Sequence, residues 1–300
     1  MIADVVVYLS SLNKQTPSRK VDVLMAFAEG ARFHGARVMI QPNYDVIPTK
    51  LAVILGWPSP LQEGRNIRLR SAVVKEQKRM GMHTMCIDAS TFKFHDKDGK
   101  YLRYSLNGVF YDTSEYANKN SDATRWMAIA NDLGLSIQPW RNSGSHILLL
   151  MQRDGGWSMK GLNPVEWTQQ KVLEVRKISD LPIVVRPHPG KKIDLSALRN
   201  YNVTISDSRV KSLEEDLQNA KAACVFNSSS GVASILRGVP LYVDDRSSVC
   251  WEVAHNDIAA INDPTFFERQ QWIYDLAAAH WSDDESRQGL VYKKFLPYLN

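Results

Sequence analysis

The stretch "VVRPHPGKK" ends a run of valines with side chains that could hold an anion. Arg186, His188 and Lys191 lie in a turn that Pro187 and Pro189 make rigid. A turn needs proline and glycine for its geometry, but it needs neither a histidine nor several cations. Guanidinium, imidazole and ammonium groups in one short turn are the donors that phosphate and carboxylate groups prefer.

A second stretch, "CVFNSSSGVASILRGVP", places hydroxyl groups directly before an apolar helix. The polar residues of this turn are Asn227, Ser228, Ser229, Ser230 and Gly231. Hydroxyl and N–H groups at a helix N-terminus, together with the positive end of the helix dipole, favour phosphate binding. Serines before helices are commonly N-caps, and a single histidine in a turn is commonly solvated, so neither stretch is decisive alone. Since both follow buried strands, we expect them to converge on one diphosphate.

The elements that must position these residues are short apolar runs alternating with amphipathic segments of helix length. In the first half, "DVVVYLS", "ARVMIQ", "LAVILGW" and "HTMCIDAS" read as buried strands, separated by helices that end in Gly35 and Gly81. Continuous β-branched runs between helices are typical of parallel strands covered on both faces. We therefore predict an α/β fold with a doubly wound sheet.

The second half repeats the pattern, so we predict two Rossmann-like doubly wound domains facing across a cleft. The N-terminal domain covers residues 1–145, and the C-terminal domain covers residues 146–300 with terminal helices. In this half, Asn163 and Pro164 mark a helix start, and "YVDDRSS" ends a further strand. The polar, aromatic residues 91–145 read as an excursion from the first sheet. The last 35 residues read as helices without further strands.

Composition excludes several classes of protein. The chain of 300 residues is 44% hydrophobic and 23% charged, which is typical of a soluble globular protein. The sequence shows no basic leader before an apolar region and no apolar run long enough to span a membrane, so a cytoplasmic protein is expected. Three cysteines without CxxC spacing indicate neither disulfides nor a zinc site.

The net charge of +5 is distributed unevenly along the chain: residues 1–145 carry +6 and residues 146–300 carry −1. The first half is therefore expected to meet an anionic partner.

The order of the two polar motifs resembles the nucleotide-binding half of GT-B glycosyltransferases. A His-Pro pair after a strand, followed about forty residues later by "SSS" and "ASILRGVPLYVDD", is similar to the capsule-type Kdo and sialyl transferases. The resemblance covers roughly residues 146–250. It implies that the His-Pro and serine motifs hold the nucleotide of a sugar donor, a UDP- or CMP-sugar, with no cofactor. The donor-binding residues are then Arg186, His188, Lys191, Asn227, Ser228, Ser229, Ser230 and Gly231, with Arg141 at the hinge and Glu252 near the ribose or sugar.

We expect an inverting transfer that does not require a metal ion, and the sequence leaves a retaining outcome open. Such a reaction needs a carboxylate that takes the proton of the acceptor hydroxyl. Asp88 ends the fourth strand where this group of enzymes carries an acidic residue, but Ala89 and Ser90 depart from the family pattern. Glu63 is the alternative, and Asp112 and Asp122 lie in the polar excursion. Isolated pairs such as "VDDR" are weak evidence for a metal, and none is assigned.

Basic residues of the first half suggest the acceptor. The predicted acceptor-binding residues are Arg65, Arg68, Arg70, Arg103 and Tyr104. Arginines interleaved with aromatic rings suit a polyanion with flat bases. The architecture and charge are similar to phage enzymes that glycosylate hydroxymethylated pyrimidines in double-stranded DNA, which would place the protein in the host cytoplasm. An acidic glycan is the alternative acceptor. A nucleotide-sugar epimerase and a silent nucleotide-binding module remain alternative functions. The sequence does not determine the oligomeric state.

Overall fold

The computed structural model describes residues 3–11, 18–96, 98–153, 157–190 and 193–299 of the chain. The chain forms two compact units. Unit 1 comprises residues 1–127 and 273–300, and unit 2 comprises residues 128–272. Each unit contains its own sheet.

The sheet of unit 1 has six strands in the order β11-β5-β4-β3-β1-β2. The strands are β1 (Val5–Tyr8), β2 (Val38–Gln41), β3 (Leu51–Leu55), β4 (His83–Ala89), β5 (Tyr101–Leu106) and β11 (His280–Ser282). The first four are parallel, whereas β5 is antiparallel to β4 and β11 is antiparallel to β5. The parallel strands run 2-1-3-4 in sequence order, the start of a flavodoxin-like arrangement.

Helices cover both faces of this sheet because the side chains of each strand alternate. Val5 and Val7 of β1 pack into the same core as Phe27 of α1 (Ser18–Phe33). Val6 on the other face packs with Val73 of α2 (Arg65–Arg79). Gly35 and Gly81, which follow α1 and α2, have φ values of 82° and 66°. Their left-handed conformation agrees with the predicted helix ends.

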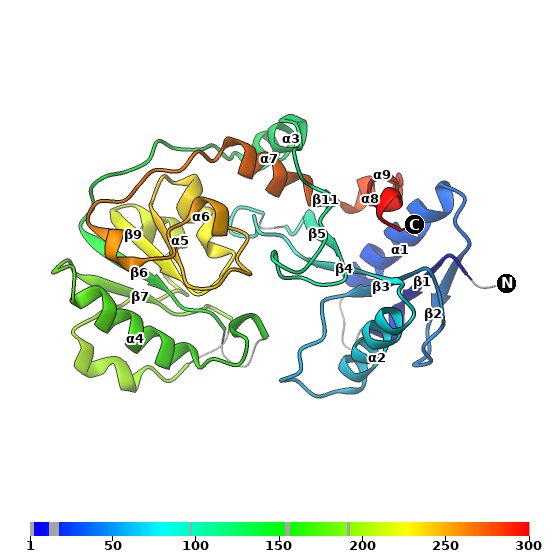
Figure 1. The fold of residues 1–300 in the computed structure, drawn as a ribbon, viewed down its shortest axis with the longest axis horizontal. Helices are drawn as coiled ribbons and strands as arrows, with labels where there is room; N and C mark the ends of the chain where they lie inside the picture. The colour runs from blue at the N-terminus through cyan, green and yellow to red at the C-terminus, as the bar shows by residue number, and fades with distance from the viewer. Residues whose placement is uncertain (1–2, 12–17, 97, 154–156, 191–192, 300) are drawn as a thin grey trace. The chain divides into compact units, whose positions relative to one another are not determined.

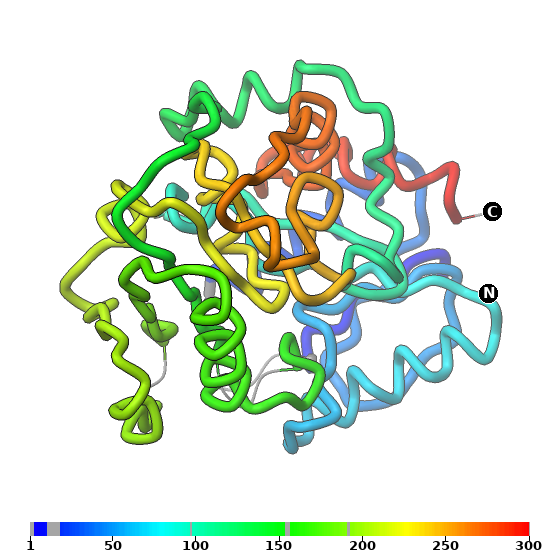
Figure 2. Tube along the Cα trace, turned by 60° about the vertical axis from the view of Figure 1, so that its left-hand side comes forward, coloured from blue at the N-terminus to red at the C-terminus, as the bar shows by residue number. Residues whose placement is uncertain are grey.

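The last residues of the chain complete unit 1. α8 (Asp283–Arg287) and α9 (Leu290–Phe295) lie beside α1, red against blue in Figures 1 and 2. Val291 and Phe295 are buried in the same core as Phe27. Gly30 permits this approach, because a Cβ atom at its position would lie 2.0 Å from the carbonyl oxygen of Ser286.

The sheet of unit 2 has five parallel strands in the order β10-β9-β6-β7-β8. The strands are β6 (His146–Leu150), β7 (Ile183–Arg186), β8 (Thr204–Ile205), β9 (Ala220–Val225) and β10 (Leu241–Val243). Read from β8, their sequence order is 3-2-1-4-5, the order of the Rossmann fold. The order reverses between β6 and β9, which defines a topological switch point.

The helices of unit 2 connect these parallel strands. They are α4 (Pro164–Arg176), α5 (Leu213–Leu217) and α6 (Ser230–Leu236), while α3 (Thr124–Leu133) and α7 (Gln270–Ala278) span the limits of the two units. Single 3₁₀ turns occupy Leu9–Ser11, Trp157–Met159, Ser196–Tyr201, Trp251–Val253, Ile258–Ile261 and Leu296–Tyr298. The Asn163 side chain accepts a hydrogen bond from the Val165 N–H at 2.8 Å, and Pro164 is the first residue of α4, as the sequence predicted.

The predicted α/β class with two doubly wound, Rossmann-like sheets is confirmed. Two local expectations were wrong. The polar excursion contains β5, whose sequence "YLRYSL" alternates polar and apolar side chains, and the terminal segment contains β11. The division of the chain also differs from the predicted 1–145 and 146–300, because residues 273–300 pack on unit 1.

Candidate functional site

The turn that contains His188 and the serine-rich turn lie at the same edge of the sheet of unit 2. His188 follows β7, and the residues 227–230, which we call the serine turn, follow β9. Because β6 is hydrogen-bonded to both strands, β7 and β9 are two strand spacings, or about 10 Å, apart. The serine turn also borders the switch point between β6 and β9, where open α/β sheets bind ligands.

Hydrogen bonds within the serine turn and the first turn of α6 use several N–H groups there. The hydroxyl of Ser228 accepts from the N–H of Ser230 at 3.2 Å and from its hydroxyl at 2.8 Å. The N–H groups of Gly231 and Val232 donate to the carbonyls of Ser228 and Ser229, both at 3.1 Å. The half-buried hydroxyls of Ser228 and Ser229 are therefore the more accessible donors for a ligand.

Asn227 connects the loops that follow three strands. Its N–H donates to Oε1 of Gln152 at 3.0 Å, and its Oδ1 accepts from Nε2 of Gln152 at 2.7 Å. Its Nδ2 donates to the carbonyl of Ser158 at 2.8 Å and to the hydroxyl of Ser247 at 2.7 Å. Gln152 and Ser158 follow β6, and Ser247 follows β10. The Asn227 side chain thus fixes the switch point, a role that its sequence context alone did not reveal.

Two aspartates after β10 are each held by a lysine. Asp244 accepts from Nζ of Lys171 at 2.8 Å and from Nε1 of Trp167 at 2.6 Å, both on α4. Asp245 lies 2.8 Å from Nζ of Lys160. Burial opposes the charge of Asp245, but hydrogen bonds from Lys160 and Ser247 outweigh it and lower the pKa of this carboxyl group.

Arg186, predicted to bind the donor, makes its contacts within unit 2. Its guanidinium is buried and donates to Oδ2 of Asp216 at 2.6 Å and to the carbonyl of Lys211 at 2.8 Å. Asp216 is fully buried and also accepts from the Ser206 hydroxyl at 2.7 Å. A buried charge needs such a partner, so Arg186 anchors the loop between β8 and α5 instead of binding the donor.

His188 keeps its predicted place, half-buried in the turn after β7. Its Nδ1 accepts from the Gly190 N–H at 2.9 Å, so the proton of the neutral ring lies on Nε2. Lys191, predicted beside it, lies outside the described residues.

Three other predicted donor residues have different surroundings. Arg141 precedes β6 and donates to the Leu217 carbonyl at 2.8 Å, near the start of β9, which places it at the opposite, amino edge of the sheet. Gly231 is a packing position, since a Cβ atom would lie 2.6 Å from a Leu241 methyl group. Glu252 is exposed on the 3₁₀ turn after β10.

The candidate base Asp88 lies near the carboxyl end of β4 in unit 1. Its side chain is 36% exposed and accepts from Nη2 of Arg103 at 3.0 Å. Nη1 of Arg70 donates to the carbonyls of Leu55 and Gly56 at the end of the neighbouring strand β3. The carboxylate is thus partly accessible and held by a cation. Glu63 is exposed in the loop after β3.

The predicted acceptor residues are only partly at the surface. Arg65 and Arg68 are exposed on α2, and Arg65 covers the Tyr44 ring at 3.9 Å from its centroid. By contrast, Tyr104 is fully buried against Phe27, and Arg70 and Arg103 are occupied as described above. Tyr104 faces inward because β5 is a sheet strand, not a surface loop, so this part of the predicted DNA-binding face was wrong.

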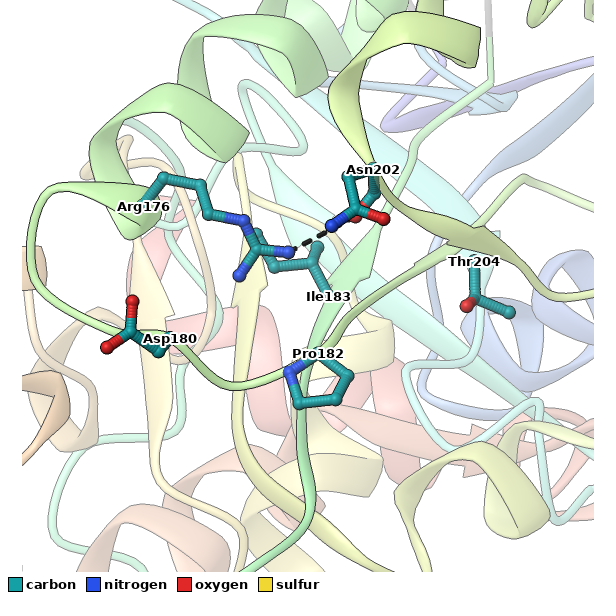
Figure 3. Close-up of a pocket in the computed structure, with 6 residues that line it drawn as sticks. All are labelled: Arg176, Asp180, Pro182, Ile183, Asn202 and Thr204. Carbon is teal, nitrogen blue, oxygen red and sulfur yellow. Dashed lines mark hydrogen bonds between the residues drawn. The ribbon is translucent and has the colours of Figure 1, made fainter.

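A shallow pocket of about 400 Å³ lies at the opposite edge of unit 2, at the amino ends of β7 and β8 (Figure 3). Arg176 crosses it and donates to the carbonyls of Leu181 at 2.6 Å and Asn202 at 3.2 Å. It contains none of the predicted site residues, and the guanidinium already binds two carbonyl groups.

Among the described residues, no group of three or more His, Cys, Asp or Glu side chains is placed to hold a metal ion. No helix within the described ranges is both long and apolar enough to cross a bilayer.

Comparison with solved structures places this arrangement among known folds. The β-Kdo 2,7-transferase KpsC of Thermosulfurimonas dismutans superposes with a TM-score of 0.56 at 14% identity, over 97% of this chain and 99% of the other. The β-Kdo 2,4-transferase KpsC of the same organism gives 0.57 at 14% identity, over 93% and 90%. The chain shares their fold. No protein-family model and no curated protein sequence matches it.

Proposed function

We propose that this chain is a GT-B-type glycosyltransferase that moves a sugar from a UDP- or CMP-sugar to an acceptor hydroxyl. The observation that carries the proposal is the Rossmann-ordered sheet of unit 2, with the serine turn at its switch point and His188 at the same edge. The shared fold with two Kdo transferases supports the same reading.

The donor half of the reaction needs stabilisation of the leaving nucleotide. Negative charge develops on the phosphate oxygen as the bond to the anomeric carbon breaks, and prearranged donors lower the energy of that state. The hydroxyls of Ser228 and Ser229 and the Nε2–H of His188 are the groups that we assign to this role. Asn227 positions the turn through its four hydrogen bonds.

The acceptor half needs a base. We assign Asp88 to this role, with Glu63 as the alternative, because Asp88 is partly exposed at the carboxyl edge of unit 1. In an inverting transfer the acceptor oxygen attacks the anomeric carbon, the carboxylate takes its proton, and the nucleotide leaves with the electron pair. This scheme needs no metal ion.

For the acceptor, we favour an acidic glycan over DNA. The solved neighbours are named as Kdo transferases, and the positive charge of residues 1–145 suits an acidic acceptor. The DNA hypothesis retains Arg65 and Arg68, but Tyr104, Arg70 and Arg103 no longer support a surface that stacks bases.

A ligand screen tests the donor proposal. Thermal unfolding is measured with CMP, UDP, GDP and available CMP- and UDP-sugars, because a ligand that binds the folded state raises the melting temperature. We expect a rise with CMP or UDP. Absence of any shift across this panel would contradict the proposed donor site.

Product analysis then separates the alternatives. A transferase that is given the nucleotide-sugar it binds should modify an acidic oligosaccharide. On the DNA hypothesis it should instead modify duplex DNA that contains hydroxymethylated pyrimidines. An epimerase converts the donor sugar without any acceptor, and a silent module binds nucleotide without turnover. Binding to DNA would also weaken steeply with salt.

A further inference from the structure

The proposed donor site needs a positive charge, and the described residues of the two sequence motifs leave that charge to another part of the site. Arg186 is committed to Asp216, and the N–H groups of Gly231 and Val232 are used within the serine turn. A nucleotide phosphate carries at least one full negative charge and is bound most strongly by charged donors. A cation held in place by contacts in the described loops at the switch point could supply this charge.

Lys160 lies in such a loop, ten residues after the end of β6. Its neighbour Met159 is buried in a cluster with Trp167 and Phe226, and Phe226 directly precedes the serine turn. The φ of Lys160 is +52°, a left-handed conformation that costs a non-glycine residue energy. Packing therefore holds the lysine backbone beside the serine turn in a strained conformation.

An ion pair and hydrogen bonds through Asp245 and Ser247 connect the Lys160 ammonium group to Asn227. It pairs with Asp245 at 2.8 Å, and Asp245 accepts from the N–H of Ser247 at 2.9 Å and from the Ser247 hydroxyl. That hydroxyl in turn accepts from Nδ2 of Asn227 at 2.7 Å. The Lys160 side chain is 35% exposed, so it reaches solvent at this edge while Asp245 is 18% exposed.

We propose that Lys160 binds the phosphate of the donor nucleotide, leaving Asp245 when the ligand enters. The inference rests on the proposed function and names a residue of the same site. Asp245 also accepts two hydrogen bonds from Ser247, so its carboxylate has other donors when the lysine exchanges it for the phosphate. Arg153 and Arg246 are also exposed near this edge, but Lys160 is the cation that joins the Asn227 network.

Nucleotide and nucleoside affinities of single variants test this role. The affinities of CMP and UDP are compared with those of cytidine and uridine by calorimetry. For Lys160→Met we expect the nucleotide that binds the wild type to lose about 10-fold or more in affinity, as for loss of a charge-assisted hydrogen bond. The affinity of the matching nucleoside should be unchanged. Lys177→Met is the matched control, since Lys177 is an exposed lysine at the other end of α4.

Two further variants keep the test decisive. Lys160→Asn removes the charge with a residue that tolerates positive φ, so its binding loss cannot be ascribed to unfolding. Asp245→Asn should leave nucleotide affinity unchanged or raise it, because the lysine no longer has to leave a carboxylate.

Two results would overturn the inference while leaving the proposed function intact. One is unchanged nucleotide affinity in both Lys160 variants. The other is an equal loss of affinity in Asp245→Asn and Lys160→Met, which would mean that the ion pair only shapes the loop. A wild-type protein that binds neither CMP nor UDP would instead reject the proposed function and, with it, this role of Lys160.

Discussion

Asp88 is the residue on which the proposed proton transfer depends. For Asp88→Asn we expect the turnover of an acceptor-dependent transfer to fall about 10²- to 10⁴-fold, the usual contribution of a general base. Nucleotide affinity should stay within about 2-fold of wild type, since Asp88 belongs to unit 1 and the assigned donor residues to unit 2. Initial rates and calorimetry measure the two effects.

Glu63→Gln provides the comparison for this prediction. Glu63 is an exposed carboxylate in the neighbouring loop, and its variant should retain near-normal turnover. A large loss in Glu63→Gln together with a small loss in Asp88→Asn would reverse the assignment of the base.

His280 should make the stability of the protein depend on pH. It is fully buried, accepts from the Thr91 N–H at 3.0 Å and donates from Nδ1 to the Leu276 carbonyl at 2.8 Å. Burial lowers its pKa to about 3, whereas an unfolded histidine titrates near 6.5. The unfolded state therefore binds the proton first, and the free energy of unfolding falls as pH drops from about 6.5 towards 3, by about 1.4 kcal/mol per unit.

A glutamine variant isolates this effect. His280→Gln keeps an acceptor for the Thr91 N–H but has no titrating group. Urea unfolding is measured at pH 7 and pH 5. The fall in the free energy of unfolding between these pH values should be about 2 kcal/mol larger in the wild type than in the variant. Identical pH dependence in the two proteins would show that His280 is not the responsible group.

At the residue scale, the sequence predicted the positions of polar side chains at strand ends better than it predicted their hydrogen-bond and ion-pair partners. His188 and the serine turn reached the expected edge because strand ends can be read from apolar runs. Arg186 was misassigned because its buried partner Asp216 lies 30 residues away, on an element that no local pattern connects to it. Lys160, to which we assign the phosphate in our proposal, could not be found from the sequence because neither its positive φ nor its pairing with Asp245 has a sequence signature.

Among the elements, the contact of α1 with the terminal helices has the sharpest steric requirement. In an unconstrained helix Ala is favoured over Gly by about 1 kcal/mol. At Gly30, however, the added methyl group would meet the Ser286 carbonyl, so Gly30→Ala should destabilise the protein by about 1–3 kcal/mol. Urea denaturation measures the change.

A neighbouring position on the same helix is the control. Arg32 is exposed on α1, so Arg32→Ala should change stability by less than about 0.5 kcal/mol. If Gly30→Ala proved stabilising, α1 and the terminal helices would have to be further apart than the structure places them.

The predictability of the elements depended on their length and neighbours. The parallel strands were predicted because burial on both faces produces long apolar runs. β5 has the alternation of a half-buried strand, but polar and aromatic neighbours led to its interpretation as a loop. β11 has three residues, too few for any periodicity, and exists because it pairs with β5.

At the scale of the whole molecule, the return of the chain to unit 1 predicts which sheet loses stability when a core side chain of the last helix is removed. Phe295 is 1% exposed and packs in the core around α1. Phe295→Ala should cost about 3–5 kcal/mol, the usual range for a large cavity. In hydrogen exchange, protection should fall in α1 and β1 to β4, while β6 and β9 keep theirs.

Uniform loss of protection in both sheets would instead indicate one cooperative unit. The matched variant is Leu290→Ala, because Leu290 is on the same helix but 41% exposed and should leave exchange nearly unchanged.

The two sheets were predictable as separate α/β layers, but the division of the chain between them was not. A helix pattern shows that a segment has an apolar face and does not show which core that face will cover. Residues 273–300 therefore join unit 1 through contacts that are distant in the sequence. These are the packing of α8 and α9 against α1 and the pairing of β11 with β5.

We expect this closure to delay the completion of unit 1 during synthesis. Residues 3–127 of unit 1 are synthesised before unit 2, but one edge strand and two covering helices of unit 1 are translated after it. Until then, the free edge of β5 and the apolar flank of α1 are exposed to other nascent chains, a state that favours association. Slow translation of the final segment should therefore increase demand for chaperones that bind the amino-terminal half.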